Sequence, residues 1–190
     1  MSGYFTDAGF FLIKTLFGLY IFAVLLRFLL QLARADFYNP LAQFLVTLTN
    51  PPLKPLRRII PGLYGIDLAS IVLLLLLEII QYALLAALRG LPMDFVMLAA
   101  SSVFDLLETT LQVYFFAILL RVILSWLSPY PNAASQLLTR LTEPVLRRAR
   151  QLVPPISGLD LSPMVAGVVI VLLQMLVMRL PLILGIRLVY

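Results

Sequence analysis

The chain has 190 residues, of which 62% are hydrophobic and 12% are charged, and its formal net charge is +5. Soluble domains contain roughly 45–50% apolar and about 25% charged residues, so the composition excludes an ordinary soluble domain and indicates a membrane protein. The sequence contains no Cys and no His. This excludes disulfides, thiolate metal centres and histidine-based acid–base chemistry, and no remaining pattern points to an enzyme, a metal or a cofactor.

Four apolar segments are long enough to cross a bilayer, whose hydrocarbon core of about 30 Å needs about 20 helical residues. They are residues 9–33, 68–88, 104–127 and 161–184. The first segment is about twice as long as the apolar region of a signal peptide and follows Asp7 rather than Lys or Arg, so we expect a retained span. The sequence therefore predicts an all-α membrane protein with four transmembrane helices.

The first two spans are joined by a proline-rich connection, residues 34–66, in which apolar side chains recur at the spacing of one helix face. These side chains are Leu41, Phe44, Leu45 and Leu48. A second short helix is expected to begin at Pro51 with Asn50 as its N-cap. Its cations are Lys54, Arg57 and Arg58. The pattern predicts an amphipathic helix in the membrane interface, followed by a basic helix at the level of the lipid headgroups.

The second span carries a carboxyl group near its centre. Glu78 lies about 16 Å beyond Asp67 at 1.5 Å per residue, in a core about 30 Å thick. Such a group must be neutral, paired or beside water, and is a functional candidate by default. Gln81 lies almost one turn further, and Gln174 lies in the fourth span. Two interpretations remain: a protonated Glu78 that joins two helices through a Gln, or the centre of a proton or cation relay.

The second half of the chain repeats the first at a shift of 94 residues, which becomes 93 after one deletion in the first connection. Arg27 aligns with Arg121, and Asp67 aligns with Asp160. The two units are residues 1–91 and 92–190. Each unit contains two spans, so the second enters the membrane in the same orientation as the first. We therefore expect two parallel helical-hairpin repeats.

The second connection, residues 128–160, has the same design as the first. Its apolar positions are Ala134, Leu137, Leu138 and Leu141. Its basic helix is expected to begin at Pro144 with Glu143 as the N-cap. The cations of that helix are Arg147, Arg148 and Arg150.

The cations of the two connections have two leading interpretations. They either rest on anionic lipid, where each could gain about 1 kcal/mol, or they dock a membrane protein partner or a second copy of the chain. Nucleic acid is disfavoured, because the cations are few, close to the membrane and without exposed aromatic residues for base stacking.

The same cations predict the orientation, because Lys and Arg in short loops are held on the cytoplasmic side. The connection between spans two and three offers only Arg89 as a cation, and the segment before the first span offers none. We expect a multi-pass protein of the bacterial inner membrane, with both proline-rich connections in the cytoplasm and both termini in the periplasm.

Two equivalent pairs of charges lie near the inner interface. Arg27 and Arg121 are about 9 Å from the cytoplasmic ends of their spans at 1.5 Å per residue, and Asp67 and Asp160 begin the spans that return. One hypothesis is that Arg27 pairs with Asp67 and Arg121 with Asp160. The other is that each Asp caps its own helix by accepting from backbone N–H groups.

Lys14 and Glu108 are equivalent by the shift of 94 and lie at the same depth near the outer face. They either meet across the axis that relates the repeats or remain separate in the interface, where a partner is favoured for Glu108 because a short Glu reaches water poorly.

The second copy also carries a recognisable set of motifs. It reads Arg121-Val-Ile-Leu-Ser125-Trp126, then Asn132, then Thr142-Glu143-Pro144, a basic run, Pro154, Gly158 and Asp160-Leu161-Ser162-Pro163. This set resembles the YGGT family of small bacterial and plastid integral membrane proteins, and the two copies cover nearly the whole chain. The first copy departs from the pattern, with Gln31-Leu32 where Ser-Trp is expected and Ala69-Ser70 where Ser-Pro is expected.

The resemblance implies a protein without established enzymatic activity, linked to osmotic or ionic stress tolerance, to envelope or division organisation and, in plastids, to assembly of a cytochrome complex. We therefore expect a non-enzymatic membrane scaffold or assembly factor that acts through its basic connections. The alternative is a small ion or osmolyte pathway centred on Glu78, which would need several copies because four Leu-rich helices enclose little water.

Overall fold

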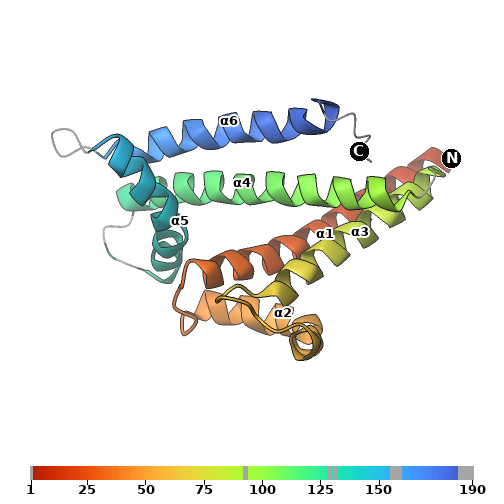
Figure 1. Ribbon diagram of the computed structural model, residues 1–190, viewed down its shortest axis with the longest axis horizontal. Helices are drawn as coiled ribbons and strands as arrows, with labels where there is room; N and C mark the ends of the chain where they lie inside the picture. The colour runs from red at the N-terminus through yellow and green to blue at the C-terminus, as the bar shows by residue number, and fades with distance from the viewer. Residues whose placement is uncertain (1, 92–93, 128–129, 131, 155–159, 184–190) are drawn as a thin grey trace.

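The computed structural model describes residues 2–91, 94–127, 130, 132–154 and 160–183, which form six α-helices and no strand (Figure 1). The helices are α1 (Ser2–Leu32), α2 (Pro40–Ile59), α3 (Leu68–Arg89), α4 (Phe95–Leu127), α5 (Ala133–Leu152) and α6 (Ser162–Ile183). Four of them, α1, α3, α4 and α6, are long and apolar enough to cross a membrane. The expected all-α fold with four spans is confirmed.

The third span begins earlier than its hydropathy suggests. Helix α4 starts at Phe95 rather than at residue 104. Asp94 precedes it and accepts a hydrogen bond of 2.9 Å from the backbone N–H of Val96, which satisfies one of the N–H groups that a helix start leaves free. The additional turns place Asp105 inside the helix instead of at its beginning.

Each proline-rich connection forms one continuous helix, so the expected division into two short helices is wrong. Helix α2 continues through Pro51, Pro52 and Pro55, and α5 continues through Pro144. A proline inside a helix removes one backbone hydrogen bond and bends the helix without necessarily ending it. The packing of these helices against the spans outweighs the loss of those bonds.

The N-caps of α2 and α5 are two asparagines that are equivalent in the repeat, not Asn50 and Glu143. The Asn39 side chain accepts a hydrogen bond of 3.0 Å from the N–H of Leu41. Asn132 accepts one of 2.8 Å from the N–H of Ser135, whose hydroxyl in turn accepts from the N–H of Asn132 at 2.9 Å. The second arrangement is a capping box.

The spans form two hairpins that run in the same direction. Helices α1 and α3 pack together, as do α4 and α6. In Figure 1, α1 and α4 both run from the end marked N toward α2 and α5, and α3 and α6 both return. This is the parallel repeat expected from the sequence. The halves are joined by α3 against α4, by a smaller contact of α1 with α4, and by contacts of α5 with α1 and α2. Helix α6 packs on α4 and α5 alone among the described helices.

The two connecting helices share one buried face, which includes Thr49 and Leu53 of α2 and the equivalent Thr142 and Leu146 of α5, but α5 buries a second face as well. In α2, Ala42, Thr49 and Leu53 are fully buried, whereas Phe44 is 65% exposed. The apolar face that the spacing predicts in α2 is therefore directed outward, where lipid can cover it. In α5, Leu141 of the expected apolar face is 1% exposed and packs in the same buried cluster as Leu53. Helix α5 thus fastens the second repeat onto the first.

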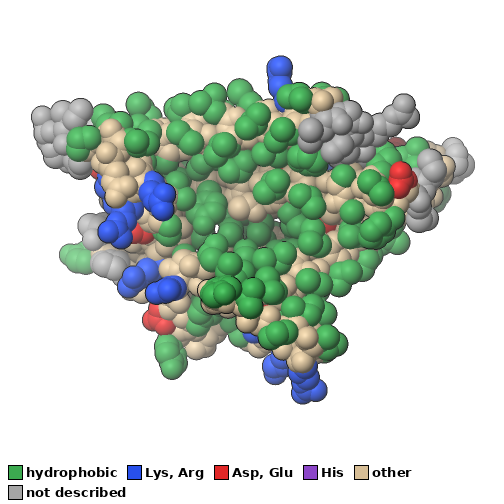
Figure 2. All heavy atoms as spheres, in the orientation of Figure 1, with side chains coloured by type: hydrophobic (Ala, Val, Ile, Leu, Met, Phe, Trp, Pro, Cys, Tyr) green, Lys and Arg blue, Asp and Glu red, His purple; other side chains and the backbone are tan. Residues whose placement is uncertain are grey.

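The outer surface is apolar over the spans and basic over the connecting helices. Large side chains such as Phe11, Leu16 and Leu172 are more than half exposed, as expected for residues that face lipid rather than water. Figure 2 shows hydrophobic side chains covering the length of the spans, while Lys and Arg gather mainly over α2 and α5. This distribution agrees with a multi-pass membrane protein whose connecting helices carry the cations.

Candidate functional site

Four side chains of the second repeat form a continuous network of ion pairs at the end of the spans that lies next to α5. Arg121 of α4 contacts Glu143 of α5 at 3.1 Å, Glu143 contacts Arg150 at 2.7 Å, and Arg150 contacts Asp160 at 3.0 Å. Arg121 also donates to the Thr142 hydroxyl at 2.9 Å. These residues come from α4, from α5 and from the segment just before α6. The network therefore connects all three helices of the repeat.

The first repeat contains the same contacts in two separate pieces. Arg27, which is 4% exposed, donates to the Thr49 hydroxyl at 2.6 Å. Arg57 pairs with Asp67 at 2.5 Å. Asn50 stands at the position of Glu143, so the first repeat has no carboxylate to join the two arginines.

The expected Arg–Asp pairs are therefore wrong in both repeats. Arg27 contacts Thr49 instead of Asp67, and Arg121 contacts Glu143 instead of Asp160. Helices α2 and α5 lie between the ends of each hairpin, so their residues contact the two arginines before either Asp can reach them. Asp67 still attracts Arg27 through space without touching it.

The alternative expectation, a helix cap, applies to Asp160. Its carboxylate accepts a hydrogen bond of 2.9 Å from the N–H of Ser162, at the start of α6. Asp67 instead accepts a hydrogen bond from the hydroxyl of Ser70, in the first turn of α3. Each Asp thus receives an arginine from the preceding helix and a second donor from the first turn of its own span.

These contacts favour the ionised form of the carboxyl groups that lie outside the spans. Burial raises the pKa of Asp67, but hydrogen bonds from Arg57 and Ser70 outweigh this effect and hold the pKa below its ordinary value. Burial likewise opposes the hydrogen bonds from two arginines that lower the pKa of Glu143. Hydrogen bonding at the start of α6 is the largest cause that lowers the pKa of Asp160. The network is therefore held together by charge at neutral pH.

The six cations considered for docking separate into two groups. Arg57 and Arg150 are engaged by Asp67 and by the network of the second repeat. The other four are exposed and form no ion pair with the described residues: Lys54, Arg58, Arg147 and Arg148. Of the six, these four can meet lipid or a partner without breaking an internal ion pair.

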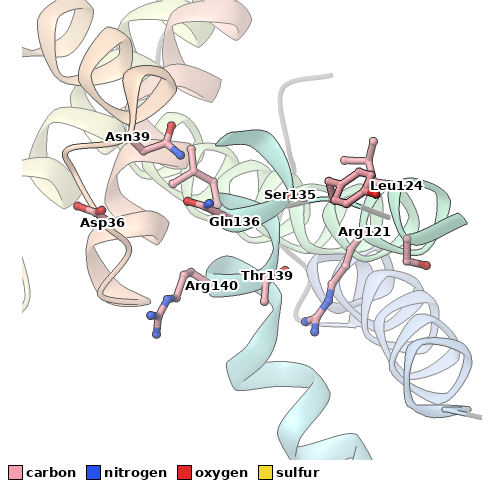
Figure 3. A pocket seen from close by; sticks show the side chains of 11 residues that line it. Asp36, Asn39, Arg121, Leu124, Ser135, Gln136, Thr139 and Arg140 are labelled. Atoms are coloured by element: carbon pink, nitrogen blue, oxygen red, sulfur yellow. The ribbon is translucent and has the colours of Figure 1, made fainter. Parts of the chain in front are cut away.

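A cavity of about 580 Å³ with several polar side chains in its lining lies between the two repeats, beside the C-terminal end of α4. Its lining includes Asp36 and Asn39 from the α1–α2 connection, Arg121 from α4, and Thr139 and Arg140 from α5. Figure 3 shows Arg121 and Arg140 on either side of Thr139, with Asp36 and Asn39 across the cavity. Guanidinium and hydroxyl groups in this arrangement can donate hydrogen bonds to a phosphate-bearing headgroup.

A second candidate site lies inside the membrane, between α3 and α4. Glu78 and Gln81 are 2% and 3% exposed. The Glu78 carboxyl interacts with the carboxyl of Asp105, which also accepts a hydrogen bond from the Tyr82 hydroxyl. The sequence reasoning missed Asp105, because the third span was expected to begin at residue 104. The apolar run over 95–103 behind Asp94 is the signal that could have extended that helix.

The other expected intramembrane contacts do not form among the described residues. Gln174 lies on α6, which does not contact α3, so it does not join Glu78 and Gln81. The Lys14 ammonium lies 5.8 Å from the centre of the Phe10 ring and attracts Asp105 rather than Glu108. Glu108 accepts a hydrogen bond of 3.2 Å from Gln112. Lys14 and Glu108 thus remain apart, because α1 packs mainly on α3 rather than on α4.

Comparison with known proteins gives a consistent assignment. The family model described as CCB3/YggT matches residues 6–88 and 100–181. An uncharacterized protein of Pseudomonas aeruginosa, PA0392, is 47% identical over 175 residues, which cover 90% of this chain and 89% of the relative. An uncharacterized protein from the proC 3' region of Vibrio alginolyticus is 41% identical over 160 residues, with 82% and 85% covered.

The uncharacterized protein YggT of Escherichia coli K12 is 35% identical over 166 residues, which cover 87% of this chain and 86% of the relative. No solved structure shows a significant match. The two segments that match the family model each contain one hairpin and its basic connecting helix. With both repeats matched and with full-length relatives of this identity, the chain belongs to the CCB3/YggT family.

Proposed function

We propose that this chain is a non-enzymatic scaffold or assembly factor of the bacterial inner membrane. In this proposal, exposed cations on α2 and α5 hold a membrane protein partner or a second copy against anionic lipid. The observation that carries it is the division of the cations into those fixed internally and those left exposed on the same helices. The context implied by the family resemblance is envelope organisation or tolerance of osmotic and ionic stress.

The exposed cations lie on a helix that is held firmly in place. This supports a role in docking over a role that only sets the orientation of the chain in the membrane. Arg147 and Arg148 lie on the same helix as Glu143 and Arg150, which tie α5 to the spans through ion pairs. Leu146 and Ala149, on the opposite face of that helix, are buried. A helix held in this way presents its cations in a fixed geometry, which reduces the entropy lost on binding a partner.

Anionic lipid is the second expected ligand of this face. In this proposal Arg121 and Arg140, which line the cavity between the repeats, lie at the cytoplasmic side beside the headgroups of the inner leaflet. Each exposed cation near such a surface gains about 1 kcal/mol. Lipid and partner binding would therefore use the same basic face.

The test is a double substitution of Arg147→Gln and Arg148→Gln, with Arg179→Gln as the matched control. Arg179 is an exposed cation at the opposite end of α6. Native mass spectrometry of the full chain, extracted with its lipids, measures the bound partner or second copy. We expect the double variant to lose that species and the control to keep it. Equal recovery from all three proteins would remove the docking proposal.

The alternative function, an ion or osmolyte pathway centred on Glu78, is favoured by one observation. Asp105 gives the centre of the membrane a second carboxyl group beside Glu78. Under this alternative, Glu78→Gln abolishes protection of cells against ionic stress, and the Arg147→Gln and Arg148→Gln substitutions leave it intact. Under the scaffold proposal the two sets of variants behave in the opposite way.

A further inference from the structure

The contact between α3 and α4 carries an ordered series of buried polar residues. At its outer end, Ala86 and Tyr82 of α3 pack with Leu98 of α4 in one buried cluster. Because the helices are antiparallel, moving inward along both leads from this cluster to Gln81 on α3 and Ser102 on α4, and then to Glu78 opposite Asp105. The two carboxyl groups therefore lie at the inner end of a polar seam that joins the two repeats.

Two hydrogen-bond acceptors of this seam lack a donor among the described residues. Glu78 Oε2 and Gln81 Oε1 are both buried without a hydrogen-bond partner among the described residues. The Tyr82 hydroxyl donates to Asp105, and the Ser102 hydroxyl donates to the carbonyl of Leu98 at 2.8 Å. Buried acceptors without a donor are costly, so their presence calls for an unseen donor or cation.

The seam also has fewer positive charges than negative charges when both of its carboxyl groups are ionised. If both are ionised, Glu78 and Asp105 contribute two negative charges in an apolar environment. Lys14 of α1 attracts Asp105 through space and is itself exposed. One further positive charge would bring the net charge of Glu78, Asp105 and Lys14 to zero, whereas a divalent cation would leave one excess positive charge.

A shared proton accounts for only part of this arrangement. A proton between Glu78 and Asp105 would relieve the repulsion of the two carboxyl groups, but it would leave Glu78 Oε2 and Gln81 Oε1 without partners. A metal cation contacts several oxygens at once, and hard cations prefer carboxylate and amide oxygens. The neighbouring Ser102 is fully buried, which favours a small dehydrated ion.

We propose that Glu78, Asp105 and Gln81 bind one small monovalent cation of the sodium class at the junction of the two repeats. Tyr82 positions the Asp105 carboxylate through its hydrogen bond. Such an ion stabilises α3 against α4, the contact that joins the two hairpins inside the membrane. The proposal concerns binding and does not require transport, so it holds whether the chain acts as a scaffold or as a pathway.

The test compares the thermal unfolding of the detergent-solubilised full chain in NaCl, KCl and choline chloride at equal ionic strength. A ligand that binds only the folded state raises its stability in proportion to occupancy, and we expect NaCl to raise the melting temperature by about 4 °C over choline chloride. Potassium should give a smaller rise. The increase should saturate with sodium concentration.

Three variants assign the effect to the site. Glu78→Gln and Asp105→Asn should abolish the sodium-dependent rise, whereas Glu108→Gln, on the next turn of α4, should retain it. The same melting temperature of the parent chain in all three salts would overturn the proposal. A proton shared by Glu78 and Asp105 would then be the remaining explanation. A rise that persists in Glu78→Gln or Asp105→Asn would overturn it as well. If both variants fail to fold, competition between sodium and potassium for the parent, followed by ²³Na line broadening, decides the outcome.

Discussion

Arg27, which is buried, and Arg121, which is partly buried, are equivalent cations that are held in different ways. Both donate to a threonine one helix later, at 2.6 and 2.9 Å. Arg121 also contacts Glu143, whereas Asn50 occupies the equivalent position beside Arg27. The residue at this one position, Glu143 or Asn50, therefore decides whether the two arginines of a repeat share one network or make two separate contacts.

Removing the carboxylate from the second repeat and adding one to the first should change the stability of the protein in opposite directions. Glu143→Gln removes the carboxylate shared by two arginines and should lower the free energy of unfolding by about 1 kcal/mol, a modest value because Glu143 is 40% exposed and screened by water. Asn50→Glu should raise it by a similar amount by joining Arg27 to Arg57. Unfolding of the purified chain in detergent measures both, and a destabilised Asn50→Glu would contradict the equivalence of the two sites.

Acid should weaken the same contacts. The pKa values of Asp67, Glu143 and Asp160 lie below their ordinary values, so their contribution to stability is complete above the unfolded-state values of about 4. It is lost as the pH falls through the lowered folded-state values. The melting temperature should therefore decrease below about pH 4, and Asp67→Asn should be less stable at pH 7 with a shallower acid decrease. An unchanged acid decrease in Asp67→Asn would contradict the assignment.

At the scale of the helices, hydropathy and periodicity predicted the spans and the connecting helices, because bilayer thickness and the helical repeat fix those patterns locally. The prolines of α2 and α5 were misleading, since a proline bends a helix when tertiary packing holds both sides. The partners of Arg27 and Arg121 could not be predicted from depth alone, because the position of α2 and α5 decides which acceptor each arginine meets. Asp105 was missed because Ser101 and Ser102 lower the hydropathy of the turns before it.

The N-cap of α2 also links the two repeats, which gives a prediction at this scale. Asn39 Nδ2 donates to the carbonyl of Ala133 at 2.8 Å, while its Oδ1 caps α2. Asn39→Ala loses both bonds and should cost about 2 kcal/mol, whereas Asn39→Asp keeps the cap and should cost about 1 kcal/mol. Asn132→Ala loses a cap alone and should also cost about 1 kcal/mol. Chemical unfolding compares the three, and equal losses would show that the link to Ala133 contributes nothing.

At the scale of the whole molecule, the parallel repeat places both connecting helices at one end of the spans (Figure 1). The cations gather over that end, which the charge rule assigns to the cytoplasm. The halves are joined by the α3–α4 seam, by a smaller contact of α1 with α4, and by the contacts of α5 with α1 and α2, which include the hydrogen bond between Asn39 and Ala133. Docking on the basic face and ion binding in the seam are thus proposed at separate positions, which allows each to be removed without the other.

Labelling of single cysteines in spheroplasts tests the orientation most directly, because the chain has no native cysteine. Thr47→Cys in α2, Gln136→Cys in α5 and Asp94→Cys before α4 all replace exposed residues. A membrane-impermeant maleimide should label Asp94→Cys in intact spheroplasts, and should label Thr47→Cys and Gln136→Cys only after permeabilisation. Labelling of either connecting helix from outside would contradict the cytoplasmic placement on which the docking proposal depends.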